Sequence, residues 1–218
     1  YEYELQRPWR YENIIAPFDF PIYKTEHEIT TERDSILSNF RPFYKRDSIE
    51  TAEIGKMVHR AMSESSKRIE MICPPSVGID SINGYIEYQL TKICKDVYER
   101  GVIDFQDQNE MGTRNDVELM VIEGNILEPY ALSEMFTMRE AYSESQGKIE
   151  KMLVRRYGSS SWVSTLAEKL PISELIEANI IYDAERTSAE RDQKLANMSL
   201  TSGMVMAGQK VISTGDIV

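Results

Sequence analysis

A long amphipathic stripe near the middle of the chain constrains the fold more than any other feature. Between Asp80 and Arg100, apolar residues recur at helical spacing, namely Ile82, Ile86, Leu90, Ile93 and Val97. This pattern predicts a helix with one buried face, and Gly101 follows it at the position where a left-handed cap is typical. The apolar face needs other elements to cover it.

Further helical patterns supply such elements. They cover residues 26–40, 48–71, 143–158, 162–170 and 172–180. Pro74-Pro75 closes the second of these, and Gly158 stops the third. Ser143 with Gln146, and Thr187 with Glu190, have the spacing of capping boxes, which predicts that two helices begin there.

The two ends of the chain have a different pattern, typical of strands. Phe18, Phe20 and Ile22 alternate near the start, where two prolines restrict the segment to extended structure. The tail at 203–218 has short β-type pairs separated by glycines. A third β-type region, 102–122, has two apolar runs around a polar loop, and we interpret it as an internal hairpin.

Together these patterns predict a predominantly helical α+β fold in a single domain, 1–218. We expect a helical lobe made of 26–100 and 130–198, with the hairpin 102–122 between them. Segments 14–24 and 203–218 are expected to form a small mixed sheet, in which Phe18–Tyr23 pairs with Val211–Val218.

Composition narrows the classes of function. The 218 residues hold 36 acids against 25 bases, and the net charge of -11 disfavours nucleic acid and anionic lipid as partners. No apolar run approaches the roughly 20 residues of a membrane-spanning helix. The chain opens YEYELQRPWR, without Met or a signal peptide, so we expect a segment of a longer protein.

Metal-binding and redox motifs are weak. Cys73 and Cys94 have no CxxC or Cys/His spacing, which leaves open two buried thiols or one disulfide. His27 and His59 are the only histidines, and neither lies near a cysteine, which disfavours zinc.

Two segments approach known ligand loops without matching them. In GMVMAGQK, from Gly203 to Lys210, Gln209 replaces the lysine of a phosphate-binding loop, so we interpret the segment as a turn. The second segment has Asp107, Asn109, Gly112 and Glu118 at four positions of a calcium loop, but Met111 replaces an oxygen ligand.

No residue therefore qualifies as catalytic, metal-binding or cofactor-binding, and the ligand-binding residues stay unknown. We expect no cofactor in this chain. The abundant carboxylates indicate solvated helix faces rather than acid–base pairs. Arg155-Arg156, just before Gly158, are expected to complement the C-terminal end of their helix.

The two ends, IIAPFDFPIYK from Ile14 and SGMVMAGQKVISTGDIV up to Val218, resemble the boundaries of one protein family. It is the extracytoplasmic domain of the bacterial seven-transmembrane HD-domain phosphohydrolases. The stretch NIIYDAERT, Asn179 to Thr187, is similar to the segment before the family's last helix. The resemblance runs from about Trp9 to Val218.

The resemblance implies a parent protein with membrane helices before and after this chain. It also implies a cytoplasmic HD domain, a metal-dependent phosphodiesterase that in characterised relatives hydrolyses cyclic di-AMP. The chain itself would be no enzyme. It would lie on the extracytoplasmic face of the bacterial inner membrane, in the periplasm of a Gram-negative cell. Because both ends would enter one bilayer, we expect them to lie close together.

Three functions remain open at this point. The first is a sensory or regulatory domain that binds an unknown extracytoplasmic ligand or protein, with a pocket between the helices and the sheet as the expected site. The second is a ligand-free structural or dimerisation module, with a homodimer face that includes Met57, Met62 and Met152. The third is an independent hydrolase, which would need a buried cluster of acids.

Overall fold

The computed structural model describes residues 2–104 and 117–218, which fall into two compact units. Unit 1 combines Tyr1–Phe40 with Ser188–Val218, and unit 2 is Arg41–Thr187. The chain therefore passes from unit 1 into unit 2 once and returns once. The sequence interpretation treats 1–218 as one domain, and these units are the compact parts within it.

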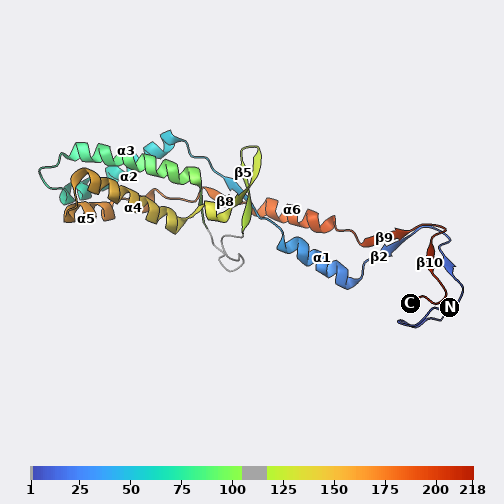
Figure 1. The fold of residues 1–218 in the computed structure, drawn as a ribbon. Coiled ribbons are helices and arrows are strands. Elements are labelled where there is room, and N and C mark those ends of the chain that lie inside the picture. The colour runs from blue at the N-terminus through green and yellow to red at the C-terminus, as the bar shows by residue number, and fades with distance from the viewer. Residues whose placement is uncertain (1, 105–116) are drawn as a thin grey trace. The chain divides into compact units, whose positions relative to one another are not determined.

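Four helices build most of unit 2 (Figure 1). They are α2 (Thr51–Ile72), α3 (Ile79–Arg100), α4 (Met138–Tyr157) and α5 (Ser161–Lys169). Helix α3 packs against α2 and α4, and α4 packs against α5. The stripe predicted from Ile82 to Val97 is buried in the main hydrophobic core, which confirms the sequence interpretation of this helix.

Helix α4 begins earlier than predicted, because a different capping box starts it. The Thr137 hydroxyl accepts from the Glu140 backbone N–H at 3.3 Å, and the Glu140 carboxylate accepts from the Thr137 N–H at 2.9 Å. The predicted box at Ser143 is therefore wrong. The helix predicted for 172–180 is also wrong, since the chain there forms a short 3-10 turn, η3 (Ile172–Glu174), and then strand β8 (Ile180–Tyr182).

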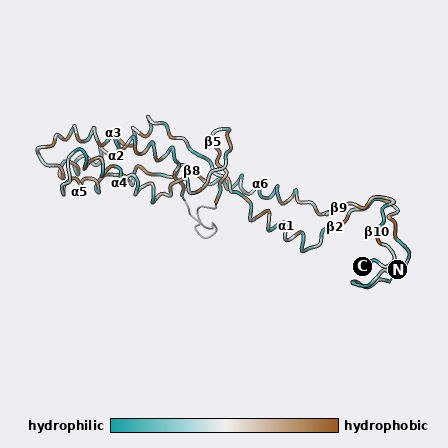
Figure 2. The backbone as a smooth tube through the Cα atoms, in the orientation of Figure 1, coloured by the Kyte–Doolittle hydropathy of each residue, from teal (hydrophilic) through white to brown (hydrophobic). Residues whose placement is uncertain are grey.

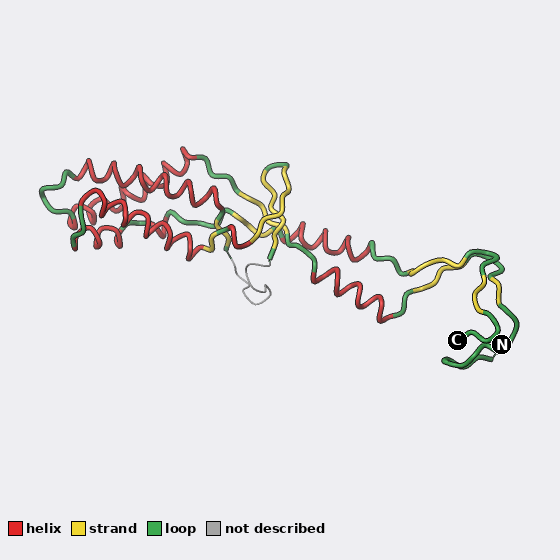
Figure 3. Tube along the Cα trace, viewed as in Figure 1, coloured by secondary structure: helices red, strands yellow, loops and turns green. Residues whose placement is uncertain are grey.

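Unit 2 also contains a six-stranded mixed sheet, with the order β6-β5-β3-β8-β4-β7. Figure 3 shows the strands in yellow and the helices in red. The other strands are β3 (Phe43–Arg46), β4 (Val102–Ile103), β5 (Glu118–Glu123), β6 (Ile126–Ala131) and β7 (Phe136–Thr137). Strands β3 and β5 run parallel, as do β4 and its neighbours β7 and β8. The α+β class is confirmed, although strands interrupt both predicted helical ranges, 26–100 and 130–198.

The hairpin predicted for 102–122 is wrong, because β4 and β5 do not pair with each other. Strand β5 instead turns back onto β6 through Gly124 and Asn125, and Gly124 has the positive φ of 58° that such a tight turn favours. Closing a two-residue connection costs less conformational entropy than closing the longer polar loop of the predicted hairpin. The calcium-loop candidates Asp107, Asn109, Met111 and Gly112 lie outside the described residues.

In unit 1 the two ends of the chain run antiparallel to each other. Strand β1 (Ile14–Ile15) pairs with β10 (Lys210–Ile212), and β2 (Phe20–Tyr23) pairs with β9 (Thr201–Val205). The Gln6 backbone N–H donates to the Val218 carbonyl oxygen at 2.8 Å. The expected closeness of the two ends is therefore confirmed, and Figure 1 shows N and C side by side.

The detailed pairing differs from the prediction. Phe18–Tyr23 was expected to pair with Val211–Val218 in one mixed sheet, whereas the structure has two separate antiparallel ladders and pairs β2 with β9. In an antiparallel pair, a step forward in one strand matches a step back in the other. Ile14 lies opposite Ile212 and Phe20 lies opposite Val205, so β2 meets the segment before the tail that was predicted to pair with it.

Two helices complete unit 1 and its connections. Helix α1 (Glu26–Ser38) begins at a capping box of Thr25 and Glu28, and α6 (Ala184–Ala196) starts in unit 2 and ends in unit 1. In the part of the chain that the structure describes, no helix combines the length and the apolar composition that a membrane span requires.

Cys73 and Cys94 are both buried free thiols. Cys73 lies at the C-terminal cap of α2, whereas Cys94 lies in α3, about 22 Å along that helix from its start at Ile79. The structure therefore has two free thiols and no disulfide between these positions. Burial raises the pKa of the Cys94 thiol to about 12 and also raises the pKa of Cys73, so both thiols stay protonated.

Candidate functional site

The segment Asn179–Thr187, which we call the clasp, holds the sheet of unit 2 to the start of α6. Asn179 is buried at its first position. Its side-chain Oδ1 accepts from the Val102 N–H at 2.7 Å, and its Nδ2 donates to the carbonyl oxygens of Tyr98 at 3.0 Å and Asp47 at 3.2 Å. One side chain therefore joins the last turn of α3, strand β4 and the residue after β3.

Asp183 is the cap of α6. Its Oδ1 accepts from the Arg186 N–H at 3.0 Å, and its Oδ2 lies 2.8 Å from the Lys45 Nζ. The hydrogen bond from Lys45, followed by that from the Arg186 backbone, holds the pKa of this carboxyl below its usual range. The capping box predicted at Thr187 and Glu190 is wrong, because the helix has already begun at Ala184.

Thr187 binds β3 instead of capping a helix. Its buried hydroxyl oxygen accepts from the Phe43 N–H at 3.0 Å, and the Phe43 carbonyl oxygen accepts from the Asp183 N–H at 2.9 Å. The Arg186 guanidinium lies 5.2 Å from the centre of the Phe43 ring. The clasp thus ties together the two places where the chain enters and leaves unit 2, next to Arg41 and Thr187.

We expect Asp183→Asn to make stability less dependent on pH. A carboxyl whose folded-state pKa is lowered stabilises the fold above its unfolded pKa, about 3.9, and this contribution is lost as the pH falls through the folded pKa. The variant should therefore have a lower melting temperature at pH 7 and approach the parent chain below about pH 4. Melting curves from pH 3 to 7 test this, and a constant difference across that range would contradict it.

A surface depression of about 480 Å³ lies in unit 2 where α3, α4 and β7 meet. It is lined by Arg100, Ser133, Met135, Phe136, Glu140, Ser143 and Glu144. This volume suits a small molecule. The place, between helices and a sheet, is of the kind expected for a ligand pocket. Sequence reasoning named one of the lining residues, Ser143, but as a helix cap and not as a ligand-binding residue.

Several polar side chains that line the depression also interact with other groups of the protein. The Arg100 guanidinium lies 4.0 Å from the centre of the Phe136 ring, and its Nε donates to the Glu134 carbonyl oxygen at 2.8 Å. Glu140 accepts in the capping box of α4, and Glu144 pairs with Lys148 at 3.4 Å. The depression is thus lined by a positioned cation, two serine hydroxyls, and two carboxylates that also bond within the protein.

His59, Glu118 and Gly208, which were singled out from the sequence, do not line the depression. His59 is exposed and lies 3.3 Å from Glu87, and Glu118 pairs with Arg41. Gly208 has a φ of 82° in a tight turn, which confirms that GMVMAGQK is a turn and not a phosphate loop.

The described residues hold neither a metal-binding cluster nor a cluster of buried acids. Within residues 2–104 and 117–218, no group of three or more His, Cys, Asp or Glu side chains could hold a metal ion. Over the same ranges, the buried carboxylate is Asp183, and Lys45 neutralises it. The buried cluster of acids that an independent hydrolase needs is therefore not found in the described ranges.

Comparison with known proteins identifies a family for this chain. A family model described as 7TM-HD extracellular matches residues 11–218. The searches of curated proteins and of solved structures gave no significant match.

Proposed function

The chain belongs to the 7TM-HD extracellular family, and from this premise we propose that it senses an extracytoplasmic ligand and regulates a membrane-bound HD-type phosphohydrolase. The catalytic part, outside this chain, would hydrolyse a cyclic dinucleotide in the cytoplasm. The first partners would be the parent protein's own membrane helices. The domain would lie outside the inner membrane, in the periplasm of a Gram-negative cell.

One observation carries this proposal, namely a short structural path from the depression to the clasp. Phe136, in the wall of the depression, pairs with Val102 in the neighbouring strand β4. The Val102 N–H donates to Asn179, the first residue of the clasp. A ligand that moves β7 against α4 would therefore act, through a single strand, on the segment that ties together both chain connections of unit 2.

Such regulation requires two arrangements of unit 2 that bind the ligand with different affinity. The short strands β4 and β7, of two residues each, are suited to a small shift because few ladder hydrogen bonds hold them. The favoured arrangement would then change the force on the clasp and on the two chain connections. The ligand itself would be polar, given the guanidinium, hydroxyl and carboxylate groups around the depression.

A thermal-shift screen of the chain tests this function. The panel contains amino acids, short peptides, nucleotides, cell-wall fragments and calcium. A ligand at a hundredfold excess over its Kd stabilises the native state by about 2.7 kcal/mol. We expect one compound to give a saturable rise in melting temperature.

A matched pair of variants locates the binding site. Ser143→Leu fills the depression and should abolish the shift, whereas Ser164→Leu, on the exposed side of α5, should leave it intact. A shift that survives in Ser143→Leu would contradict the assignment of the site. No shift with any compound, together with a dimer in solution, would favour the structural module.

The dimerisation module remains the second candidate, but its predicted face is occupied. Met62 lies in the hydrophobic core, and Met57 and Met152 are partly buried against that core. These methionines pack within unit 2 and do not form a free face for a second copy. The depression therefore supports the sensory role better than these methionines support the dimerisation module.

A further inference from the structure

The paired ends of the chain expose an unusual amount of apolar surface. We define the arm as residues 2–24 and 200–218, which contain β1, β2, β9 and β10. Of the twenty large hydrophobic side chains exposed in the described residues, twelve lie in the arm. They are Tyr3, Leu5, Tyr11, Ile15, Phe18, Ile22, Tyr23, Leu200, Met204, Met206, Val211 and Ile217.

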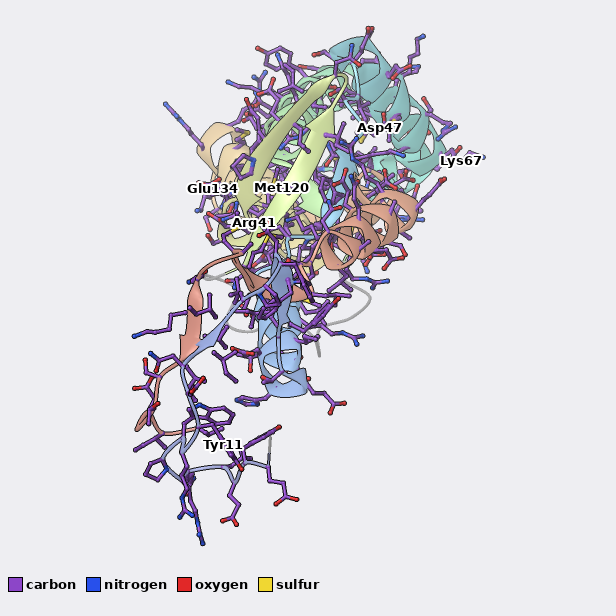
Figure 4. All side chains as sticks on the ribbon, turned by 90° about the vertical axis from the view of Figure 1, so that its right-hand side faces the viewer. Tyr11, Arg41, Asp47, Lys67, Met120 and Glu134 are labelled. Carbon is purple, nitrogen blue, oxygen red and sulfur yellow. The ribbon has the colours of Figure 1, made fainter. Side chains whose placement is uncertain are left out.

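The architecture of the arm explains this exposure. Its ladders have two strands each, and most of their side chains are exposed, although Trp9, Ala16 and Val205 in the arm are buried. Ile22 pairs with Gly203 in the β2–β9 ladder, so these two positions share a face. Successive side chains in a strand point to opposite faces, so Met204, the residue after Gly203, lies on the other face from Ile22. Both are exposed. Figure 2 shows apolar residues along these strands, and Tyr11 is labelled in the arm in Figure 4.

Charge separates the arm from the rest of the chain. The arm holds five acids and four bases, while the whole chain holds 36 and 25, so nearly all the net charge of -11 lies outside the arm. An acidic protein surface is repelled by anionic lipid headgroups. The near-neutral arm is therefore the part of the chain that can approach a lipid surface with little electrostatic cost.

We propose that the arm lies in the lipid–water interface of the membrane, with its exposed apolar and aromatic side chains among the headgroups and the first acyl carbons. This inference rests on the proposed extracytoplasmic placement. Tyrosine is enriched in this layer because its ring is apolar and its hydroxyl is polar, and Tyr3, Tyr11 and Tyr23 are all exposed.

A second copy of the chain would fit the arm less well than lipid. A stable protein interface covers about 800 Å² of each partner, usually on one face. The arm exposes apolar side chains on both faces of a thin ladder, and a fluid layer can surround both faces at once. The contact between Gln6 and Val218 also brings both ends of the arm to the same place.

Vesicle flotation tests the proposal directly. The chain 1–218 is mixed with vesicles of pure phosphatidylcholine, and its partition coefficient is compared between two triple variants. Leu5→Ser, Phe18→Ser and Ile217→Ser together should lower partitioning about tenfold or more. Met71→Ser, Tyr88→Ser and Ile126→Ser, at equally exposed positions of unit 2, should leave it unchanged.

The two tryptophans of the chain provide a second readout, since Trp9 is in the arm and Trp162 is in unit 2. In Trp162→Phe, brominated phosphatidylcholine should quench the remaining Trp9 fluorescence. In Trp9→Phe, the fluorescence of Trp162 should stay unquenched.

Three results would overturn the proposal: no partitioning of the parent chain, equal loss in both triple variants, or quenching of Trp162 alone. The surface would instead be assigned to a second copy by a different result. In that case the parent chain would sediment as a dimer and not bind vesicles, and only the arm triple variant would sediment as a monomer. The thermal-shift screen does not involve the arm. A negative vesicle experiment would therefore not contradict the sensory function. A negative thermal-shift screen would not contradict the lipid contact.

Discussion

Asn179→Ala is expected to lower the free energy of unfolding by about 3 to 5 kcal/mol. The Asn179 side chain makes three hydrogen bonds in a buried place, to Val102, Tyr98 and Asp47. Alanine would leave a buried N–H without its acceptor and two carbonyl oxygens without these donors. Each unsatisfied buried group costs about 1–3 kcal/mol, and the removed side chain also leaves a small void.

Urea denaturation followed by circular dichroism measures this loss. Asn197→Ala is the matched control, because Asn197 is exposed at the end of α6, and its variant should change stability by less than about 0.5 kcal/mol. Asn179→Asp provides a stricter comparison. The new carboxylate can still accept from the Val102 N–H, but its other oxygen faces the carbonyl oxygens of Tyr98 and Asp47. The Asn179→Asp variant should therefore be no more stable than Asn179→Ala at pH 7. A change near zero in both would mean that the clasp does not hold the sheet.

Gly101→Ala is expected to cost about 2 to 4 kcal/mol, from backbone strain and a steric clash. Gly101 ends α3 with a φ of 98° and a ψ of 133°, a conformation that residues with a Cβ rarely adopt. A Cβ there would lie 3.1 Å from the Ile180 Cγ1 and 3.3 Å from its Cδ1. Ile180 is buried in the sheet, so it has little room to move.

A second glycine in the same helix is the control for this prediction. Gly84 lies within α3, and a Cβ there would meet nothing within 4 Å. Gly84→Ala should therefore stabilise the chain by about 0.5 to 1 kcal/mol, through the higher helix propensity of alanine. The two variants change the same residue type, inside α3 and at its C-terminal cap, with opposite expected signs. Equal melting temperatures for both would contradict the assignment of strain to Gly101.

The helices of unit 2 could be predicted because their signals are local. The apolar spacing of α3 identifies its buried face without reference to any other element, and Gly101 and Gly158 stand at the ends of α3 and α4. The first residue of a helix was harder to predict from the sequence than its last residue. Thr137 with Glu140 and Ser143 with Gln146 have the same spacing, and only the backbone hydrogen bonds of the folded chain select the first.

Strand partners could not be predicted in the same way. The short apolar run at Val102–Ile103 indicates a strand, but its alternation is equally compatible with any neighbour. Its partners, β7 and β8, follow it by tens of residues and run parallel to it. A hairpin with the next β-type run was therefore the simplest interpretation and was wrong.

The amino-acid sequence alone determined the α+β class, the long helices, the turn at Gly208 and the membership suggested by the two chain ends, because each depends on residues close together or on a family pattern. The tertiary structure alone decided the clasp and the depression. Thr187 meets Phe43 across 144 residues, and the depression takes its walls from α3, β7 and α4. Such sites exist only where packing brings distant polar groups together, and no local spacing records which partners will meet.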